Sequence, residues 1–261
     1  MDGEQQIVGE RAPDRVVLRV TGEERVAFLQ NLVTNNVEAL KDGMVYSALL
    51  SPQGKFLADF FLVPQDDAIL IDIAKALAPG IAQRLGMYKL RAAVDISATD
   101  MSVVRGLGTP PPGSFADPRH DALGWRAYGV AGSDPSIDWD AIRVEHVIPE
   151  TGFELVPNET YILEVGFEAV GGVDFRKGCY VGQEVTARMK HKSTLNKGLV
   201  VVDVDGPAAP GAEITANGKP VGTLHTRSGG KALAYLRFNR AKGDLVAGRA
   251  KITWTGAPNG D

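Results

Sequence analysis

The chain has 261 residues, of which 44% are hydrophobic and 23% charged, the composition of a globular protein with room for two domains. Its single cysteine, Cys179, excludes an internal disulfide and any zinc or iron–sulfur site made only from cysteines of one chain. The net charge of −4 argues against direct nucleic-acid binding, and the first fifteen residues lack a signal-peptide pattern, so we expect a soluble cytoplasmic protein.

The N-terminal part begins with a strand–helix pair. Residues 16–20 are mostly β-branched and predict a short strand. Thr21 and Glu24 have the spacing of a capping box, so we expect a helix that begins here. The pair Asn35–Asn36 marks its expected end.

The next segment predicts an antiparallel meander and a second helix. Residues 44–73 contain three apolar runs separated by turn-forming residues, which is typical of three consecutive strands. A helical stretch follows that Pro79 either interrupts or restarts. Two more strands are expected at residues 92–99 and 101–107, before a proline- and glycine-rich connection that runs to Gly124.

The C-terminal part changes from helices to strands. One helix is expected from Asp138 or Trp139 to near Pro149, and a shorter one is expected to be capped around Asn158. Residues 182–192 predict a third helix, in which Glu184 and Arg188 form an i,i+4 pair. From residue 199 onward short strands alternate with turns, which indicates a small all-β module of five to seven strands.

The segment "FRKGCYVGQE" places Cys179 just before the start of a helix and beside Arg176 and Lys177. The positive end of a helix dipole and nearby cations both favour a thiolate, and Gly178 and Gly182 allow another group to approach the backbone. The alternative is an ordinary tight loop with a partly buried thiol. A nucleophilic hydrolase is disfavoured, because the four histidines offer no general base at a recognisable spacing.

The run "KGCYVGQE" resembles the signature of the YgfZ-type folate-binding proteins, relatives of the glycine-cleavage T-protein that include a mitochondrial factor for late iron–sulfur cluster assembly. The runs "FLQNLVTNNV", "DGMVYSALLSPQGKFLADFFLV" and "NGKPVGTLHTRS" with "ALAYLR" support this resemblance in the expected order. It implies an α+β fold: a T-protein-like region of antiparallel sheets and helices around a central opening, followed by a small β-barrel. The division is expected at residues 1–194 and 195–261, with an inserted subdomain at roughly 50–110.

The resemblance also implies a function. The chain is expected to bind tetrahydrofolate or a derivative and to support assembly or repair of iron–sulfur clusters in client enzymes, including tRNA-modifying ones. Its implied partners are iron–sulfur assembly proteins or those clients. Cys179 is the candidate reactive residue, because one cysteine can contribute one ligand to a transient cluster shared with a partner, or act as a redox-sensitive thiol.

Two departures separate this chain from the T-proteins. Those transferases carry an Asp-Asp pair where this chain has Ala58 and Asp59, and they lack the KGCYVGQE run, so an accessory factor is favoured over the alternative, a folate-dependent aminomethyltransferase. Relatives also have glycine where this chain has Val147, and a β-branched residue disfavours a positive φ.

The predicted folate contacts follow from the chemistry of the ligand. Glu145 suits the donor edge of a pterin, Arg143 its glutamyl tail, and Tyr46 its flat ring; each also has an ordinary alternative as a surface or core residue. The full set of predicted binding residues is Tyr46, Asp59, Arg143, Glu145, Lys177, Gly178, Tyr180, Gly182, Gln183, Glu184 and Arg188. A third hypothesis, RNA binding by the basic stretch from Arg188 to Lys197, is the least favoured because the chain is acidic.

Overall fold

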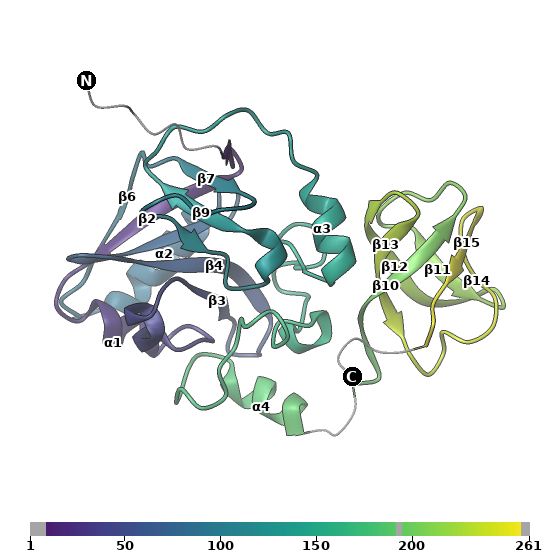
Figure 1. Cartoon of the computed structure of the whole chain (residues 1–261). Helices are drawn as coiled ribbons and strands as arrows, with labels where there is room; N and C mark the ends of the chain where they lie inside the picture. The colour runs from purple at the N-terminus through teal and green to yellow at the C-terminus, as the bar shows by residue number, and fades with distance from the viewer. Residues whose placement is uncertain (1–8, 192–194, 257–261) are drawn as a thin grey trace. The chain divides into compact units, whose positions relative to one another are not determined.

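The computed structural model of the chain describes residues 9–191 and 195–256 (Figure 1). The chain divides into two compact units that alternate along the sequence. The first comprises Met1–Leu50, Ala58–Ile137 and Gly171–Val181, and the second Ser51–Leu57, Asp138–Val170 and Gly182–Asp261. The predicted domain boundary at residues 194 and 195 stays a prediction, because residues 192–194 lie outside the described part.

The meander predicted for residues 44–73 is present and forms most of a five-stranded sheet. The strands of this sheet are β2 (Arg15–Thr21), β3 (Val45–Leu50), β4 (Phe56–Gln65), β5 (Ala68–Ala74) and β6 (Asp95–Ala98), and the meander is β3, β4 and β5. They lie in the order β3-β4-β5-β2-β6, and β5 pairs antiparallel with both β2 and β4. The first eight residues of β4 are buried, as expected from the continuous apolar run of this strand.

A second sheet of four strands surrounds Trp125. Its strands are β1 (Glu10–Arg11), β7 (Val103–Gly106), β8 (Phe115–Ala116) and β9 (Trp125–Tyr128), in the order β1-β7-β9-β8. The indole of Trp125 lies so close to Gly106 that a Cβ there would be 2.3 Å from the ring. The segment between residues 106 and 124, predicted to be a connection without strands, contains the short strand β8.

The first helix differs from the sequence prediction at both ends. Helix α1 spans Arg25–Gln30 only, and Asn36 instead caps the 3-10 helix η1 (Val37–Lys41). The predicted capping box is wrong: Thr21 is the last residue of β2, and the Glu24 carboxylate accepts a 2.6 Å hydrogen bond from the Ala93 backbone N–H. The Glu24 carboxylate therefore accepts from a residue distant in the sequence, whereas the local spacing predicted that it accepts from the start of its own helix.

The remaining helices lie near their predicted positions. They are α2 (Ala78–Lys89), α3 (Trp139–His146), the 3-10 helix η3 (Ile162–Val165) and α4 (Gln183–His191). Pro79 occupies the first turn of α2 and so restarts the helix, and Asp138 caps α3 through the Ala141 N–H at 3.0 Å. Asn158 does not cap η3, whose cap is Tyr161. No helix within the described ranges is long and apolar enough to cross a membrane.

The expectation that Val147 avoids a positive φ is wrong. Val147 follows α3 in the left-handed conformation, with φ 52° and ψ 47°, and its N–H donates to the Arg143 carbonyl. The helix end needs this conformation to satisfy a last-turn carbonyl, and glycine is the residue that adopts it without strain.

Val147→Gly should therefore raise the free energy of unfolding by about 1 kcal/mol, since a β-branched side chain is strained at this φ. Urea denaturation measures the change. The matched control is Val26→Gly, a partly exposed valine inside α1, which should instead lower stability by about 1 kcal/mol. Equal losses in both variants would contradict the strain argument.

The predicted all-β module is a closed six-stranded barrel. Its strands are β10 (Lys197–Asp205), β11 (Glu213–Ala216), β12 (Lys219–Ser228), β13 (Lys231–Arg237), β14 (Leu245–Ala247) and β15 (Ala250–Thr253), in the order β10-β13-β12-β11-β14-β15 (Figure 1). Alternate residues such as Val200, Val202 and Val204 form its buried core. Closure pairs every strand on both sides, which leaves no free sheet edge.

Candidate functional site

Lys177 fastens the cysteine-bearing loop to the end of α1. Its Nζ donates to the carbonyl oxygens of Gln30 and Val33, the second at 2.6 Å. Gln30 is the last residue of α1, where a carbonyl lacks a helical partner and a cation is favoured, and Val33 lies three residues beyond the helix. In return, the Gln30 side chain donates to the Lys177 carbonyl at 3.3 Å. The structure thus brings together two of the runs that carried the family resemblance.

The residues before the cysteine loop are also held by side chains that donate to their backbone carbonyls. Thr34 Oγ1 donates to the Gly172 carbonyl at 2.7 Å, and Asn35 Nδ2 donates to the carbonyls of Gly171 and Tyr46 at 2.6 and 2.8 Å. Sequence analysis did not single out Thr34 or Asn35 as functional. Their side chains fix the path of the backbone that leads into the cysteine loop.

Cys179 itself is an exposed free thiol. It follows Gly178, whose φ of 101° suits glycine. Burial lowers the pKa of Lys177 to about 8, although Asp174 and Cys179 act in the opposite direction. Any effect of the α4 dipole on the thiol stays a prediction, because Cys179 and α4 belong to different units. The structure thus presents an exposed thiol on a firmly held loop.

Lys177→Met should lower the free energy of unfolding by about 1–2 kcal/mol, because the backbone carbonyls of Gln30 and Val33 lose a charged donor. The adjacent Arg176→Met is the matched control: its side chain is 95% exposed, and no measurable change is expected. Urea denaturation of both variants compares them. A loss of similar size in the two variants would contradict the fastening role of Lys177.

The other residues of the KGCYVGQE run have mixed surroundings. Tyr180 is buried, with the Lys177 ammonium 5.3 Å from its ring centre. Gly182 accepts from Thr186 inside the second unit, and Gln183 begins α4 half-buried. The predicted Glu184–Arg188 ion pair is absent within the described residues, and both side chains are exposed.

Tyr46 and Asp59, predicted to contact folate, instead contact each other. The Tyr46 hydroxyl donates to Asp59 Oδ2 at 2.8 Å, and both residues are only 1% exposed. The Tyr46 ring packs against Phe61, with centroids 5.1 Å apart, and the Arg119 guanidinium lies 5.4 Å from the ring centre. This ring is covered by protein groups, so it does not present a surface for a pterin to stack on.

Next to this pair lies a buried ionic cluster that sequence analysis missed. Asp72 accepts from Arg15 at 2.7 Å, from Arg126 at 3.1 Å and from the Tyr128 hydroxyl at 3.0 Å. Burial acts to raise the pKa of Asp72, but Arg15 and Arg126 outweigh it and hold the pKa below its usual value. Asp117 bridges Arg119 and Arg126, and its pKa falls to about 2 because the two guanidinium groups outweigh burial.

Arg143 and Glu145, the remaining predicted folate residues, also lack the expected arrangement. The Arg143 guanidinium donates to Glu154 at 3.0 Å, to Asp140 at 2.8 Å and to Thr226 at 3.0 Å, and Arg143 is 3% exposed. Glu145 is exposed on α3. Within their own units, Tyr46, Asp59, Arg143 and Glu145 do not form a site that fits a pterin and its tail.

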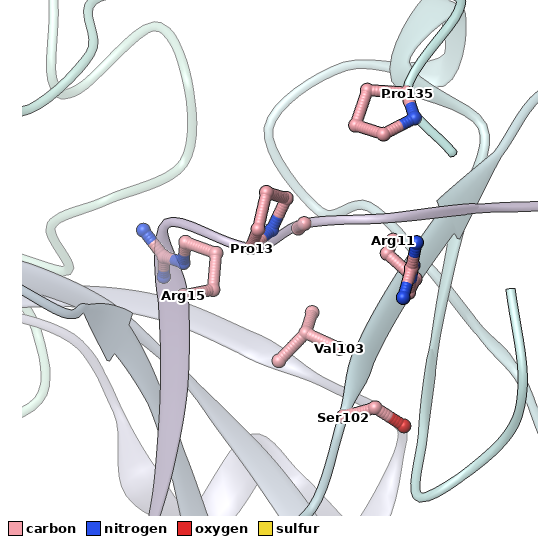
Figure 2. A pocket seen from close by; sticks show the side chains of 7 residues that line it. Arg11, Pro13, Arg15, Ser102, Val103 and Pro135 are labelled. Atoms are coloured by element: carbon pink, nitrogen blue, oxygen red, sulfur yellow. The ribbon is translucent and has the colours of Figure 1, made fainter. Parts of the chain in front are cut away.

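Two cavities are lined by residues outside the cysteine loop. One, of about 300 Å³, is lined in the first unit by Arg11, Pro13, Arg15, Ser102, Val103 and Pro135 (Figure 2). Of its two guanidinium groups, that of Arg15 is buried and paired with Asp72, and that of Arg11 forms an exposed pair with Asp134. The second, of about 280 Å³, lies in the second unit and is lined by polar groups that include Lys55, Tyr161, Glu164, Lys197, His225 and Tyr235.

The described residues contain no group of three or more His, Cys, Asp or Glu side chains that could hold a metal ion. The sequence-based expectation of a shared, transient cluster stays a prediction.

Comparison with known proteins finds relatives that are named as iron–sulfur cluster assembly factors. Residues 196–258 match the family model of the CAF17 C-terminal beta-barrel domain. The chain is 31% identical over 223 residues to a protein of Mycosarcoma maydis named mitochondrial iron–sulfur cluster assembly factor IBA57 homolog, covering 73% of this chain and 55% of that protein. It is 28% identical to the mitochondrial iron–sulfur cluster assembly factor IBA57 of Mus musculus, covering 90% of this chain and 79% of that protein.

A solved structure confirms the predicted fold class. The glycine cleavage system aminomethyltransferase T of Bartonella henselae matches with a TM-score of 0.74 over 94% of this chain and 83% of that chain, at 14% identity. At this identity the likeness concerns the fold. Together with the closed barrel, it confirms a T-protein-like region followed by a C-terminal barrel.

The relatives also correct one prediction. The expectation of a cytoplasmic protein is wrong, since the names of the Mycosarcoma maydis, Mus musculus and Homo sapiens proteins place them in mitochondria. The chain spans only about half of the Mycosarcoma maydis protein, 55% of its length.

Proposed function

We propose that this chain, which is similar in sequence to IBA57-type iron–sulfur cluster assembly factors, is itself an accessory factor for the assembly or repair of iron–sulfur clusters. The observation that carries the proposal is the exposed thiol of Cys179 on a loop fastened to the end of α1. The narrower YgfZ-type assignment, and client enzymes that modify tRNA, belong to the same proposal. Its partners are cluster assembly proteins or the client enzymes.

In the proposed role, Cys179 binds the cluster cargo through one Fe–S bond. The thiol releases its proton to solvent, and its sulfur replaces one existing ligand of a cluster whose other ligands belong to a partner or a second copy. Lys177 lies next to the sulfur and carries a positive charge that a thiolate-bound, negatively charged cluster would favour. No oxidant or reductant is needed, because the step exchanges ligands only.

Depletion of the protein from its own cells tests the proposal. The activity of enzymes that contain [4Fe–4S] clusters should fall, while a cluster-free dehydrogenase keeps its activity as the control. Reintroduction of the wild-type chain should restore the lost activity. Unchanged cluster-enzyme activity after depletion would overturn the proposed function.

Folate binding is a separate prediction, and no step of the proposed role depends on it. The four predicted pocket residues do not fit a pterin within their units, although the fold resembles that of an aminomethyltransferase. Anaerobic titration of wild type and Cys179→Ser with tetrahydrofolate decides the matter. Binding by both would show that folate binding does not require the thiol. No binding by wild type would remove both folate and the alternative of aminomethyl transfer, and would leave the cluster role standing.

A further inference from the structure

The C-terminal barrel carries an excess of positive charge that the acidic chain as a whole conceals. From Lys197 to Lys251 there are nine Lys or Arg and four Asp or Glu, whereas the full chain has 28 and 32. A charge asymmetry of this kind between parts of a chain indicates an anionic partner for the basic part. The net charge of −4, used above to argue against nucleic-acid binding, is therefore the sum of a basic barrel and a more acidic remainder of the chain.

Four of these cations gather at one end of the barrel. Lys219 begins β12 opposite Ala216, in the hairpin that turns at Asn217. The turn after β13 carries the others: Arg240 N–H donates to the Arg237 carbonyl, and Lys242 N–H to the Arg240 carbonyl. A cavity of about 520 Å³ joins the hairpin to this turn, and its lining residues are Ala216, Asn217, Lys219, Pro220, Val221 and Arg240. We call Lys219, Arg237, Arg240 and Lys242 the barrel-end patch.

The cations of the barrel-end patch have no carboxylate partner in the described part of the chain. All four are exposed, and Asp244 is the one acidic residue between positions 217 and 244. Cations near α4 are different: Lys190 pairs with Glu168 at 2.6 Å and Lys197 with Glu164 at 3.3 Å. The stretch from Arg188 to Lys197, considered above for RNA binding, is thus partly neutralised, while the barrel-end patch is not.

The surroundings of the barrel-end patch decide between a protein and a nucleic acid as its partner. Protein interfaces are centred on exposed aromatic, Met or other apolar anchors, whereas nucleic-acid interfaces are polar and strongly positive. Among the described barrel residues, the exposed large hydrophobic side chain is Val246, at 41%. The cavity is also lined by the buried apolar side chain of Val221 and by the exposed Asn217, which suit one unstacked base and its edge.

We propose that the barrel-end patch binds single-stranded nucleic acid, with phosphates on its Lys and Arg side chains and one base in the adjoining cavity. The inference is independent of the cluster chemistry at Cys179. It concerns a surface that the fold places in the second unit.

Fluorescence anisotropy of the full chain with a labelled single-stranded RNA of about 12 nucleotides tests the proposal. We expect a Kd of about 10 µM at about 50 mM salt, and a slope of log K against log salt of about −3 for four phosphate contacts. Lys219→Gln with Arg240→Gln should weaken binding about tenfold and reduce the slope to about −1.4. The matched control is Lys231→Gln with Lys251→Gln, which removes equal charge beside Asp203 and Asp205 and should change binding less than about twofold.

Three results would each overturn the proposal. The first is no RNA binding by wild type at about 50 mM salt. The second is an equal loss in the site and control variants, which would indicate attraction by overall charge. The third is equally tight binding of a poly-glutamate peptide with the same sensitivity to Lys219 and Arg240, which would identify an acidic protein segment as the partner.

Discussion

Cys179→Ser should fail to restore iron–sulfur enzyme activity in cells depleted of the wild-type protein, although its melting temperature should match that of the wild type. The thiol is exposed, so a serine hydroxyl at this place costs no buried contact. A hydroxyl does not ionise near neutral pH and is a poor ligand for iron–sulfur clusters, so the expected loss of function is complete. Activity of a [4Fe–4S] client enzyme in cell extracts is the measurement.

Arg176→Ser provides the matched control in the same loop. Its side chain is 95% exposed and its nearest acidic partner, Asp174, is 3.8 Å away, so this variant should restore activity fully. Restoration by Cys179→Ser to the wild-type level would exclude the thiol as a cluster ligand. Failure of both variants would instead indicate that the loop serves as a contact surface.

Asp72→Asn should lower the free energy of unfolding by about 3–5 kcal/mol, because it leaves two buried guanidinium groups without a full counter-charge. The Asp72 side chain is fully buried, and those of Arg15 and Arg126 are 4% and 3% exposed. Water therefore cannot replace the lost carboxylate. Chemical denaturation compares the variant with the wild type.

The surface pair Arg19–Asp67 is the natural control, because its 2.6 Å ion pair joins the same residue types. The side chain of Asp67 is 75% exposed, so Asp67→Asn should cost less than about 1 kcal/mol. Equal effects of the two Asp→Asn changes would show that burial does not govern the stability contributed by the ionic cluster.

The same cluster predicts how stability depends on pH. The pKa values of Asp72 and Asp117 are lower in the folded protein than in the unfolded chain, that of Asp117 being about 2. A carboxylate with a lowered folded pKa contributes its full stability above its unfolded pKa near 3.8 and loses it as the pH falls through the folded value. Denaturation midpoints should therefore fall between about pH 4 and pH 2, and less steeply in Asp72→Asn.

The types of the elements were predictable because they depend on local patterns. Turn residues between apolar runs predicted the meander of β3, β4 and β5, and regular alternation with turns predicted the barrel. The ends of elements were less predictable where a distant group forms the hydrogen bond that a local group was expected to form. Glu24 shows this, since its carboxylate serves Ala93, about seventy residues away, in place of its own helix.

The candidate site was predictable as a list of residues but not as an arrangement. The run around Cys179 stands out in the sequence because a lone thiol, glycines and cations occur together. Nothing local indicates that Lys177 donates to the end of α1, 147 residues earlier, or that Tyr46 donates to Asp59 and is buried. A hydrogen-bond partner is chosen by where the chain path brings two groups, and burial then decides whether a polar side chain can meet a ligand or must be satisfied within the protein.

The ionic cluster depends on tertiary structure in the same way. Arg15, Asp72, Asp117 and Arg126 occupy separate elements or loops, and in the sequence each looks like a solvated surface charge. Local propensity determines whether a segment becomes helix or strand, since it acts over a few residues. The packing of those segments determines which charges lose water together, and that collective desolvation has no signature in any one stretch of sequence.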